Sequence, residues 1–176
     1  MSAQVSVLFL LPFLASGQQT NLPRFEDYRV TRVYRGSVKP PRFGNPDQYE
    51  GTDQRCFGLE PAAYAKLPVN FAGHYVISAC SCGTGCHYLY LWDAVTGKFY
   101  RDFPFGPIDI GPFDVGQDSP PVEYKGEQFR RDSSLLILDG CIEDTCDCAT
   151  RYYRWDGRRF KLITRQQSRQ PHKCPE

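Results

Sequence analysis

The stretch that decides the fold is residues 73–103, GHYVISACSCGTGCHYLYLWDAVTGKFYRDF. Its first part is rich in β-branched and aromatic residues, and its middle part, HYLYLW, alternates His and Leu with Tyr and Trp. Such alternation is typical of a strand with two different faces. Glycine-containing turns separate these parts, so we expect an antiparallel hairpin followed by a third strand. The expected strands are Gly73–Cys80, His87–Trp92 and Lys98–Phe103.

The same pattern returns about 62 residues later in the chain. Ser134–Leu138 (SLLIL) is apolar, Arg151–Trp155 (RYYRW) is aromatic, and Arg159–Arg165 (RFKLITR) alternates basic and apolar residues. Each of these segments is typical of a strand. Both units therefore run strand, cysteine-bearing turn, strand ending in Trp-Asp, turn, strand. The matching positions are Cys80 with Cys141, Cys86 with Cys148, and Trp92-Asp93 with Trp155-Asp156.

The two units define the expected fold class. We predict a mainly β protein, with one or more antiparallel sheets built from two related three-stranded meanders and stapled by disulfides. A single meander cannot bury its apolar face, so the two should pack together or join one sheet. Elsewhere, Tyr28–Tyr34 (YRVTRVY) is an expected strand, Pro61–Leu67 (PAAYAKL) an expected short helix, and the proline-rich Pro104–Pro121 an expected irregular connection.

The N-terminal segment predicts export. Val5–Leu14 is an almost unbroken apolar run, too short to cross a bilayer, which takes roughly 20 residues, but suited to a signal peptide. Small residues follow it, so we expect cleavage after Gly17, although no Lys or Arg precedes the run. The alternative is a buried first strand or helix of a cytosolic protein. We predict a signal peptide over residues 1–17 and a single β-rich domain over residues 18–176, periplasmic or secreted and without a membrane span.

The cysteines support export independently. All eight follow the expected cleavage site, and an even number in a short exported chain predicts a disulfide framework. The sequence does not fix the pairing, but equivalent strand ends favour Cys80 with Cys141, a tight turn favours Cys82 with Cys86, and a bond from Cys56 to Cys174 would hold the C-terminal tail. The disulfide candidates are Cys56, Cys80, Cys82, Cys86, Cys141, Cys146, Cys148 and Cys174.

The cluster Cys80, Cys82, Cys86 and His87 also has a metal-binding interpretation. Structural zinc sites usually draw their ligands from two well-spaced pairs, whereas three sulfurs here crowd into seven residues. Exported thiols also tend to oxidise. We therefore favour disulfides, and we assign neither a metal nor a cofactor.

Four residues are candidates for function: Asn70, His74, Tyr75 and His87. The two histidines are expected on neighbouring strands, where they could approach each other. A strand histidine is nevertheless more often a hydrogen-bonded structural residue than a catalyst. We find no Ser or Cys nucleophile within a known activating motif.

The charge distribution does not indicate a nucleic-acid partner. The net charge is +1, too close to neutral to imply binding to nucleic acid or membrane. Basic residues do alternate with aromatic ones over Arg151–Arg165. Such a face can bind an anionic polymer, but an ordinary amphipathic strand explains the same pattern.

Three motifs resemble those of a family of small exported bacterial proteins. They are Asn70–Tyr75 (NFAGHY), Cys82–Cys86 (CGTGC) and Trp92–Lys98 (WDAVTGK), and a fourth, less specific one is Tyr152–Gly157 (YYRWDG). The likeness runs from about Val69 to Ile163, more than half of the expected mature chain. It implies export and the fold, and it implies no activity. The chain departs from the family pattern at Cys80, Ser81, Cys141 and Cys146.

Three features together favour one function. They are rigid strands joined by disulfides, long Pro- and Gly-rich loops, and the lack of a recognisable set of catalytic residues. We predict an exported, non-enzymatic binding module, of inhibitor or immunity type, whose partner is another exported protein or a cell-envelope component. The alternative is a metal-dependent or hydrolase-like enzyme that uses His74 and His87 around the Cys82–Cys86 turn.

Overall fold

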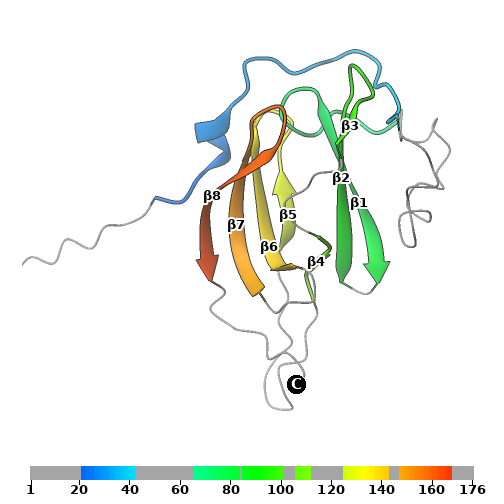
Figure 1. The fold of residues 1–176 in the computed structure, drawn as a ribbon. Helices are drawn as coiled ribbons and strands as arrows, with labels where there is room; N and C mark the ends of the chain where they lie inside the picture. Colours follow the sequence, from blue (N-terminus) through cyan, green and yellow to red (C-terminus); the bar gives the residue numbers. More distant parts are fainter. Residues whose placement is uncertain are drawn as a thin grey trace, which may run out of the picture.

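The computed structural model describes residues 21–42, 66–83, 85–100, 106–111, 125–142 and 147–167. Their strands form one eight-stranded antiparallel sheet (Figure 1), which confirms the predicted mainly β fold. No helix among these residues is long and apolar enough to span a membrane. The elements are the 3₁₀ helix η1 (Phe25–Tyr28) and the strands β1 (Tyr75–Gly83), β2 (Cys86–Asp93), β3 (Phe99–Tyr100), β4 (Ile108–Asp109), β5 (Gly126–Phe129), β6 (Leu135–Ile142), β7 (Asp147–Trp155) and β8 (Phe160–Gln167).

The sheet contains both predicted meanders. Strands β1, β2 and β3 pair in sequence order, and so do β6, β7 and β8. The order across the sheet is β1-β2-β4-β6-β7-β8, with β3 beside β2 and β5 beside β6. The short strand β4 therefore joins the two meanders into one sheet (Figure 1).

Both meanders turn in the same way after their Trp-Asp pair. The Asp93 Oδ1 accepts hydrogen bonds from the backbone N–H groups two and three residues further on, at 2.7 and 3.2 Å. The Asp156 Oδ1 does the same at 2.9 and 3.0 Å. Aspartate is favoured in turns because its side chain can satisfy these donors. A phenylalanine also faces each tryptophan across the hairpin, Phe99 facing Trp92 and Phe160 facing Trp155.

The main core lies between the inner faces of the two meanders. Tyr75 on β1 packs edge-to-face on Trp155 of β7, with ring centroids 5.4 Å apart. These strands are far apart in the sheet order, so the sheet must curl to bring its two halves together. The buried members of this core are Phe71, Ala72, Tyr75, Ile77, Leu89, Leu91, Ile108, Leu136, Leu138, Tyr153, Trp155 and Phe160.

A second, smaller core lies on the opposite face of the first meander. Because alternate residues of a strand point to opposite faces, Val76 and Trp92 are directed away from the main core and form this cluster with Ala94. Segments outside the strands pack against it through Tyr34, Val38, Leu67 and Val69, together with Phe99 of β3.

The prediction of a strand over Tyr28–Tyr34 is wrong. Helix η1 ends at Tyr28, and the extended segment after it crosses the end of the sheet (Figure 1, blue). Its strand-like pairing is the isolated bridge from Arg29 to Ser133. The apolar side chains of the segment do not lie along one strand but go to different places, Val30 to the main core and Tyr34 to the second.

The prediction of an irregular connection over Pro104–Pro121 missed β4. Residues 106–111 are described, and Ile108 and Asp109 pair with β2 on one side and β6 on the other. A Cβ added at Gly140 of β6 would lie 2.5 Å from the Asp109 carbonyl oxygen, so the close approach of β4 requires a glycine there. Most of the expected helix Pro61–Leu67, residues 61–65, lies outside the described residues.

Candidate functional site

Asn70 is held by both ends of its side-chain amide. Its Nδ2 donates to the Ile77 carbonyl oxygen and its Oδ1 accepts from the Ile77 N–H, each at 2.8 Å. A buried or half-buried amide is stable only when its donors and acceptors are satisfied. Asn70 thus fixes the chain entering β1 and has a structural role.

The residues after Asn70 form a tight loop. The Phe71 and Tyr75 backbones are hydrogen-bonded to each other in both directions, at 3.1 and 2.9 Å. Between them the φ angles are +41° at Ala72 and +85° at Gly73, in the left-handed region. At Gly73 a Cβ would also lie 2.5 Å from the Arg32 carbonyl oxygen. The requirement for glycine here is therefore both conformational and steric.

This loop also binds two other segments of the chain. The Gly73 carbonyl accepts a hydrogen bond from the Tyr34 N–H at 2.7 Å, and the Gly73 N–H donates to the Arg131 carbonyl at 2.7 Å. The Ala72 N–H donates to the Ser133 carbonyl at 3.1 Å. The loop 70–75 consequently fixes the segment around Tyr34 and the turn before β6 relative to each other.

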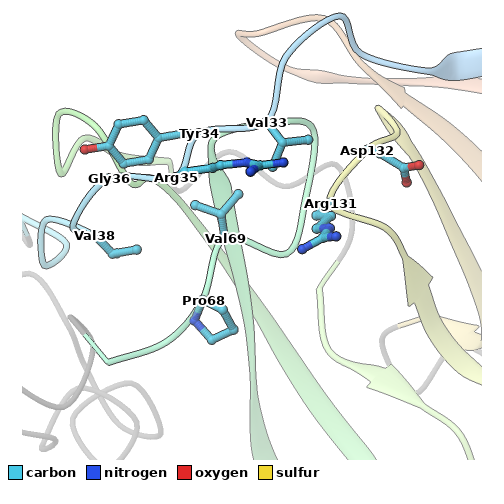
Figure 2. Close-up of a pocket in the computed structure, with 9 residues that line it drawn as sticks. All are labelled: Val33, Tyr34, Arg35, Gly36, Val38, Pro68, Val69, Arg131 and Asp132. Atoms are coloured by element: carbon cyan, nitrogen blue, oxygen red, sulfur yellow. The ribbon is translucent and has the colours of Figure 1, made fainter.

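A groove of about 680 Å³ lies between these two segments (Figure 2). Valine side chains and one proline make it partly apolar, and Tyr34 also lines it, with its hydroxyl donating to the Ser37 carbonyl at 3.1 Å. We call this site the loop groove. It is lined by Val33, Tyr34, Arg35, Gly36, Val38, Pro68, Val69, Arg131 and Asp132.

Two cations of the loop groove have no partner in the part of the chain that the structure describes. The exposed guanidinium groups of Arg35 and Arg131 make no hydrogen bond or ion pair with any described residue. Asp132, the acidic group of the lining, is instead held by Arg130, with contacts of 3.0 and 2.9 Å to its two carboxylate oxygens. This guanidinium holds the pKa of Asp132 below its usual value. Within the described residues, the loop groove therefore has two uncompensated positive charges.

His74 and Tyr75 are the last two residues of the same loop but do not line the groove. His74 is half-exposed, its ring lies 4.2 Å from that of Tyr75 between centroids, and its Nε2 is 3.9 Å from the Asp93 Oδ2. Tyr75 is buried and packs edge-to-face on Tyr100 at 6.0 Å. Burial, the neighbouring Tyr75 hydroxyl and the Asp93 carboxylate raise the pKa of Tyr100 to about 12.

We expect this raised pKa to weaken the fold in alkali. An unfolded tyrosine ionises near its ordinary pKa of 10.0, whereas folded Tyr100 holds its proton to a pKa of about 12. In this window the unfolded state binds fewer protons, so the free energy of unfolding should fall as the pH rises. Urea unfolding of the wild type and of Tyr100→Phe at several pH values checks this. The free energy of unfolding should decline less steeply with pH in the variant than in the wild type. Equal slopes would contradict the assignment of the effect to Tyr100.

His87 lies at the other end of the hairpin. Residue Tyr75 faces Asp93 and Ser81 faces His87, so six positions of β1 separate the two ends. At about 3.3 Å per residue this is roughly 20 Å, and the structure does not bring the two histidines together. The His87 Nδ1 instead lies 3.3 Å from a carboxylate oxygen of Glu127 on β5.

The predicted bond from Cys82 to Cys86 is confirmed. It closes the turn between β1 and β2, where the Cα atoms are 5.1 Å apart. A second disulfide joins Cys141 to Cys148, which face each other on β6 and β7 with Cα atoms 3.9 Å apart. Each closes a short loop and stabilises one hairpin end.

The predicted pairing of Cys80 with Cys141 is wrong, because Cys141 is bonded to Cys148. Cys80 is itself in a disulfide, and its partner lies outside the described residues. Cys146 and both members of the suggested pair, Cys56 and Cys174, also lie outside them. The sulfurs of Cys80, Cys82 and Cys86 are therefore not free thiolates. Within the described part of the chain, no group of three or more His, Cys, Asp or Glu residues is placed to hold a metal ion.

The sequence predicts the importance of the loop but gives no sign of the groove. The Asn70–Tyr75 motif pointed to this region, and the structure assigns Asn70 and Tyr75 to its framework. Arg35 and Arg131 are far apart in the sequence, and each looks like an ordinary surface arginine. The hydrogen bonds of Gly73, together with the bond from the Val30 N–H to the Asp132 carbonyl, bring their segments together in the structure.

No protein-family model matches the chain, and no curated protein or solved structure matches it either. The resemblance to small exported bacterial proteins therefore stays a prediction.

Proposed function

We propose that the protein is an exported, non-enzymatic binding module that recognises another exported protein or a cell-envelope component through the loop groove. The observation that carries this proposal is the pair of guanidinium groups, Arg35 and Arg131, that have no partner among the described residues and lie beside an apolar valine lining. Exposed charges next to apolar surface are typical of binding sites, which combine a few polar anchors with apolar contact area.

The frame of the groove supports the same proposal. Its two walls are hydrogen-bonded to the loop 70–75, and that loop is anchored in the main core by the fully buried Phe71. A site fixed before binding loses less conformational freedom when its ligand arrives, and so retains more affinity. This property suits an inhibitor or immunity-type protein, which acts by occupying the surface of another protein.

The disulfides support an extracytoplasmic location. The bonds Cys82–Cys86 and Cys141–Cys148 and the bonded state of Cys80 would be reduced in most cytosols, whereas the periplasm and the extracellular medium preserve such bonds.

A photo-crosslinking experiment tests the proposed function. A benzophenone amino acid is placed at Pro68, which is exposed in the groove lining, or at Val95, which is 37% exposed outside it. Both variants are irradiated in cells that express the protein naturally. We expect a discrete adduct from position 68 that is absent from position 95. No adduct from position 68, or the same adducts from both positions, would contradict the proposal.

A further inference from the structure

We infer that the ligand of the loop groove is an acidic peptide segment of a partner protein, with carboxylates for Arg35 and Arg131 and an apolar side chain between them. This inference rests on the proposed function and adds the chemistry of the partner. Figure 2 shows both arginine side chains near Val69, whose side chain lies in the middle of the lining.

The charges favour a carboxylate-bearing ligand. A guanidinium group has five N–H donors in a planar fork that matches a carboxylate in two parallel hydrogen bonds. Arg35 and Arg131 use none of these donors within the described structure, and the acidic residue of the lining, Asp132, is already bonded to Arg130. A ligand that brings two carboxylates would satisfy both cations.

The apolar lining favours a peptide over an acidic polysaccharide. Three valines, Val33, Val38 and Val69, line the groove between and beside the arginines. A peptide can place a Leu or Phe side chain against them, whereas a sugar chain offers mainly hydroxyl groups, which would lose hydrogen bonds to water on that surface. The volume of about 680 Å³ is also within the range of sites that enclose a small ligand.

The test uses two blocked peptides, one of sequence Glu-Phe-Asp-Leu-Glu and one in which each acid is replaced by its amide, Gln-Phe-Asn-Leu-Gln. Each is titrated into the full, ¹⁵N-labelled, disulfide-bonded chain while amide chemical shifts are recorded. We expect the acidic peptide to shift the amides of Val33, Val69 and Arg131, and to bind about tenfold more tightly than the amide peptide. Its affinity should fall as salt is added, because exposed charges are screened.

Variants identify the residues responsible. Arg35→Gln and Arg131→Gln should each weaken binding of the acidic peptide about three- to tenfold, in keeping with exposed charge-assisted hydrogen bonds. Arg158→Gln is the matched control, since this exposed arginine lies in the turn after β7 and does not line the groove, and it should bind as the wild type does. Thermal unfolding of each variant confirms that the fold is unchanged.

The outcomes separate this inference from the proposed function. Equal binding of both peptides, or tighter binding of a heparin-derived disaccharide used as a third probe, would overturn the acidic-peptide assignment. A positive crosslink from position 68 would in that case leave the binding role in place. Absence of that crosslink would remove the proposed function and this inference with it.

Discussion

Phe71→Ala should lower the free energy of unfolding by about 3–5 kcal/mol, a large part of the roughly 5–15 kcal/mol that typically holds a domain folded. Phe71 is fully buried. Its ring lies 6.4 Å from that of Phe129 on β5 and 5.8 Å from that of Phe160 on β8, between centroids. The loop that organises the groove is thus anchored to β5 and to β8 of the second meander, and truncation leaves a cavity where they meet.

Denaturant unfolding of the disulfide-bonded protein measures this loss. Phe71→Leu is the matched control, because it keeps most of the volume and should cost about 1 kcal/mol. If Phe71→Ala were no more destabilising than Phe71→Leu, the loop would not depend on this anchor. The loop groove should also lose ligand affinity in the alanine variant at temperatures where the rest of the sheet is still folded.

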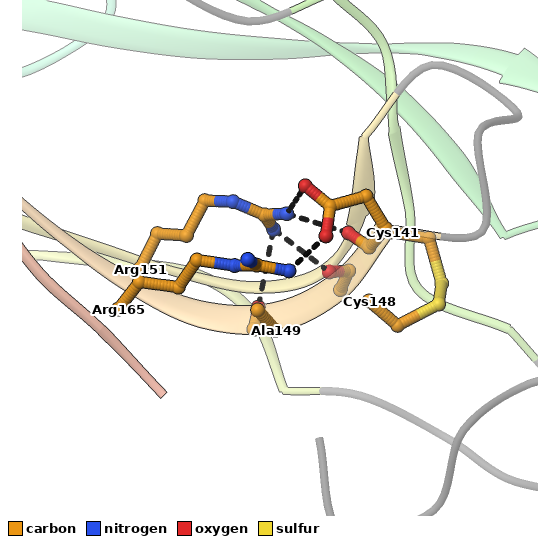
Figure 3. The surroundings of a disulfide bond; sticks show 7 residues. Cys141, Cys148, Ala149, Arg151 and Arg165 are labelled. Atoms are coloured by element: carbon orange, nitrogen blue, oxygen red, sulfur yellow. Dashed lines mark hydrogen bonds and ion pairs between the residues drawn. A yellow bond between two sulfur atoms is a disulfide. The ribbon is translucent and has the colours of Figure 1, made fainter. Parts of the chain in front are cut away.

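Arg151→Met should be the next most damaging substitution, with a loss of about 2–3 kcal/mol. Arg151 is only 4% exposed, and its guanidinium donates to the carbonyl oxygens of Gly140, Ala149 and Asp147 at 3.3, 3.4 and 2.6 Å (Figure 3). It also pairs with the Asp147 carboxylate at 2.6 Å. Methionine has a similar length but would leave these acceptors without their donor.

The neighbouring Arg165 provides a matched control. It binds the other oxygen of the same Asp147 carboxylate but is 38% exposed, and exposed ion pairs contribute about 1 kcal/mol or less. Arg165→Met should therefore be far milder than Arg151→Met in the same unfolding assay. Equal losses would show that the carboxylate contacts matter more than the buried carbonyl contacts. Arg151→Lys should not restore stability, since an ammonium group lacks the planar fork.

The sequence predicted those parts of the fold that are determined by residues close together in the chain. Alternation of side chains and Gly-containing turns specify β1 with β2, and the Asp93 and Asp156 turns end both Trp-Asp strands in the same way. The bond from Cys82 to Cys86 was predictable because only a turn separates them. The strands β4 and β5 were missed because they are short and are stabilised by neighbours distant in the sequence.

The predicted pairing of Cys80 with Cys141 was wrong because of the order of the strands in the sheet. Equivalent strands of a repeat are not neighbours here, because β2 and β4 lie between β1 and β6. Three steps of about 4.8 Å across a sheet exceed the roughly 7 Å that a disulfide allows between Cα atoms. The expectation that His74 and His87 could approach each other was wrong for a similar reason. His74 immediately precedes β1 and His87 lies on the neighbouring strand β2, but the register of the two strands places the histidines at opposite ends of the hairpin.

The side chain of Asn70 has a consequence for how the protein behaves at high concentration. An outermost strand offers unused donors and acceptors, to which a strand of another molecule can add, and repeated addition leads to aggregation. Strand β1 is outermost in the sheet, and Asn70 already occupies both the N–H and the carbonyl of Ile77. One amide of the chain itself thus occupies, at Ile77, donor and acceptor groups that a foreign strand would need in order to add to this border of the sheet.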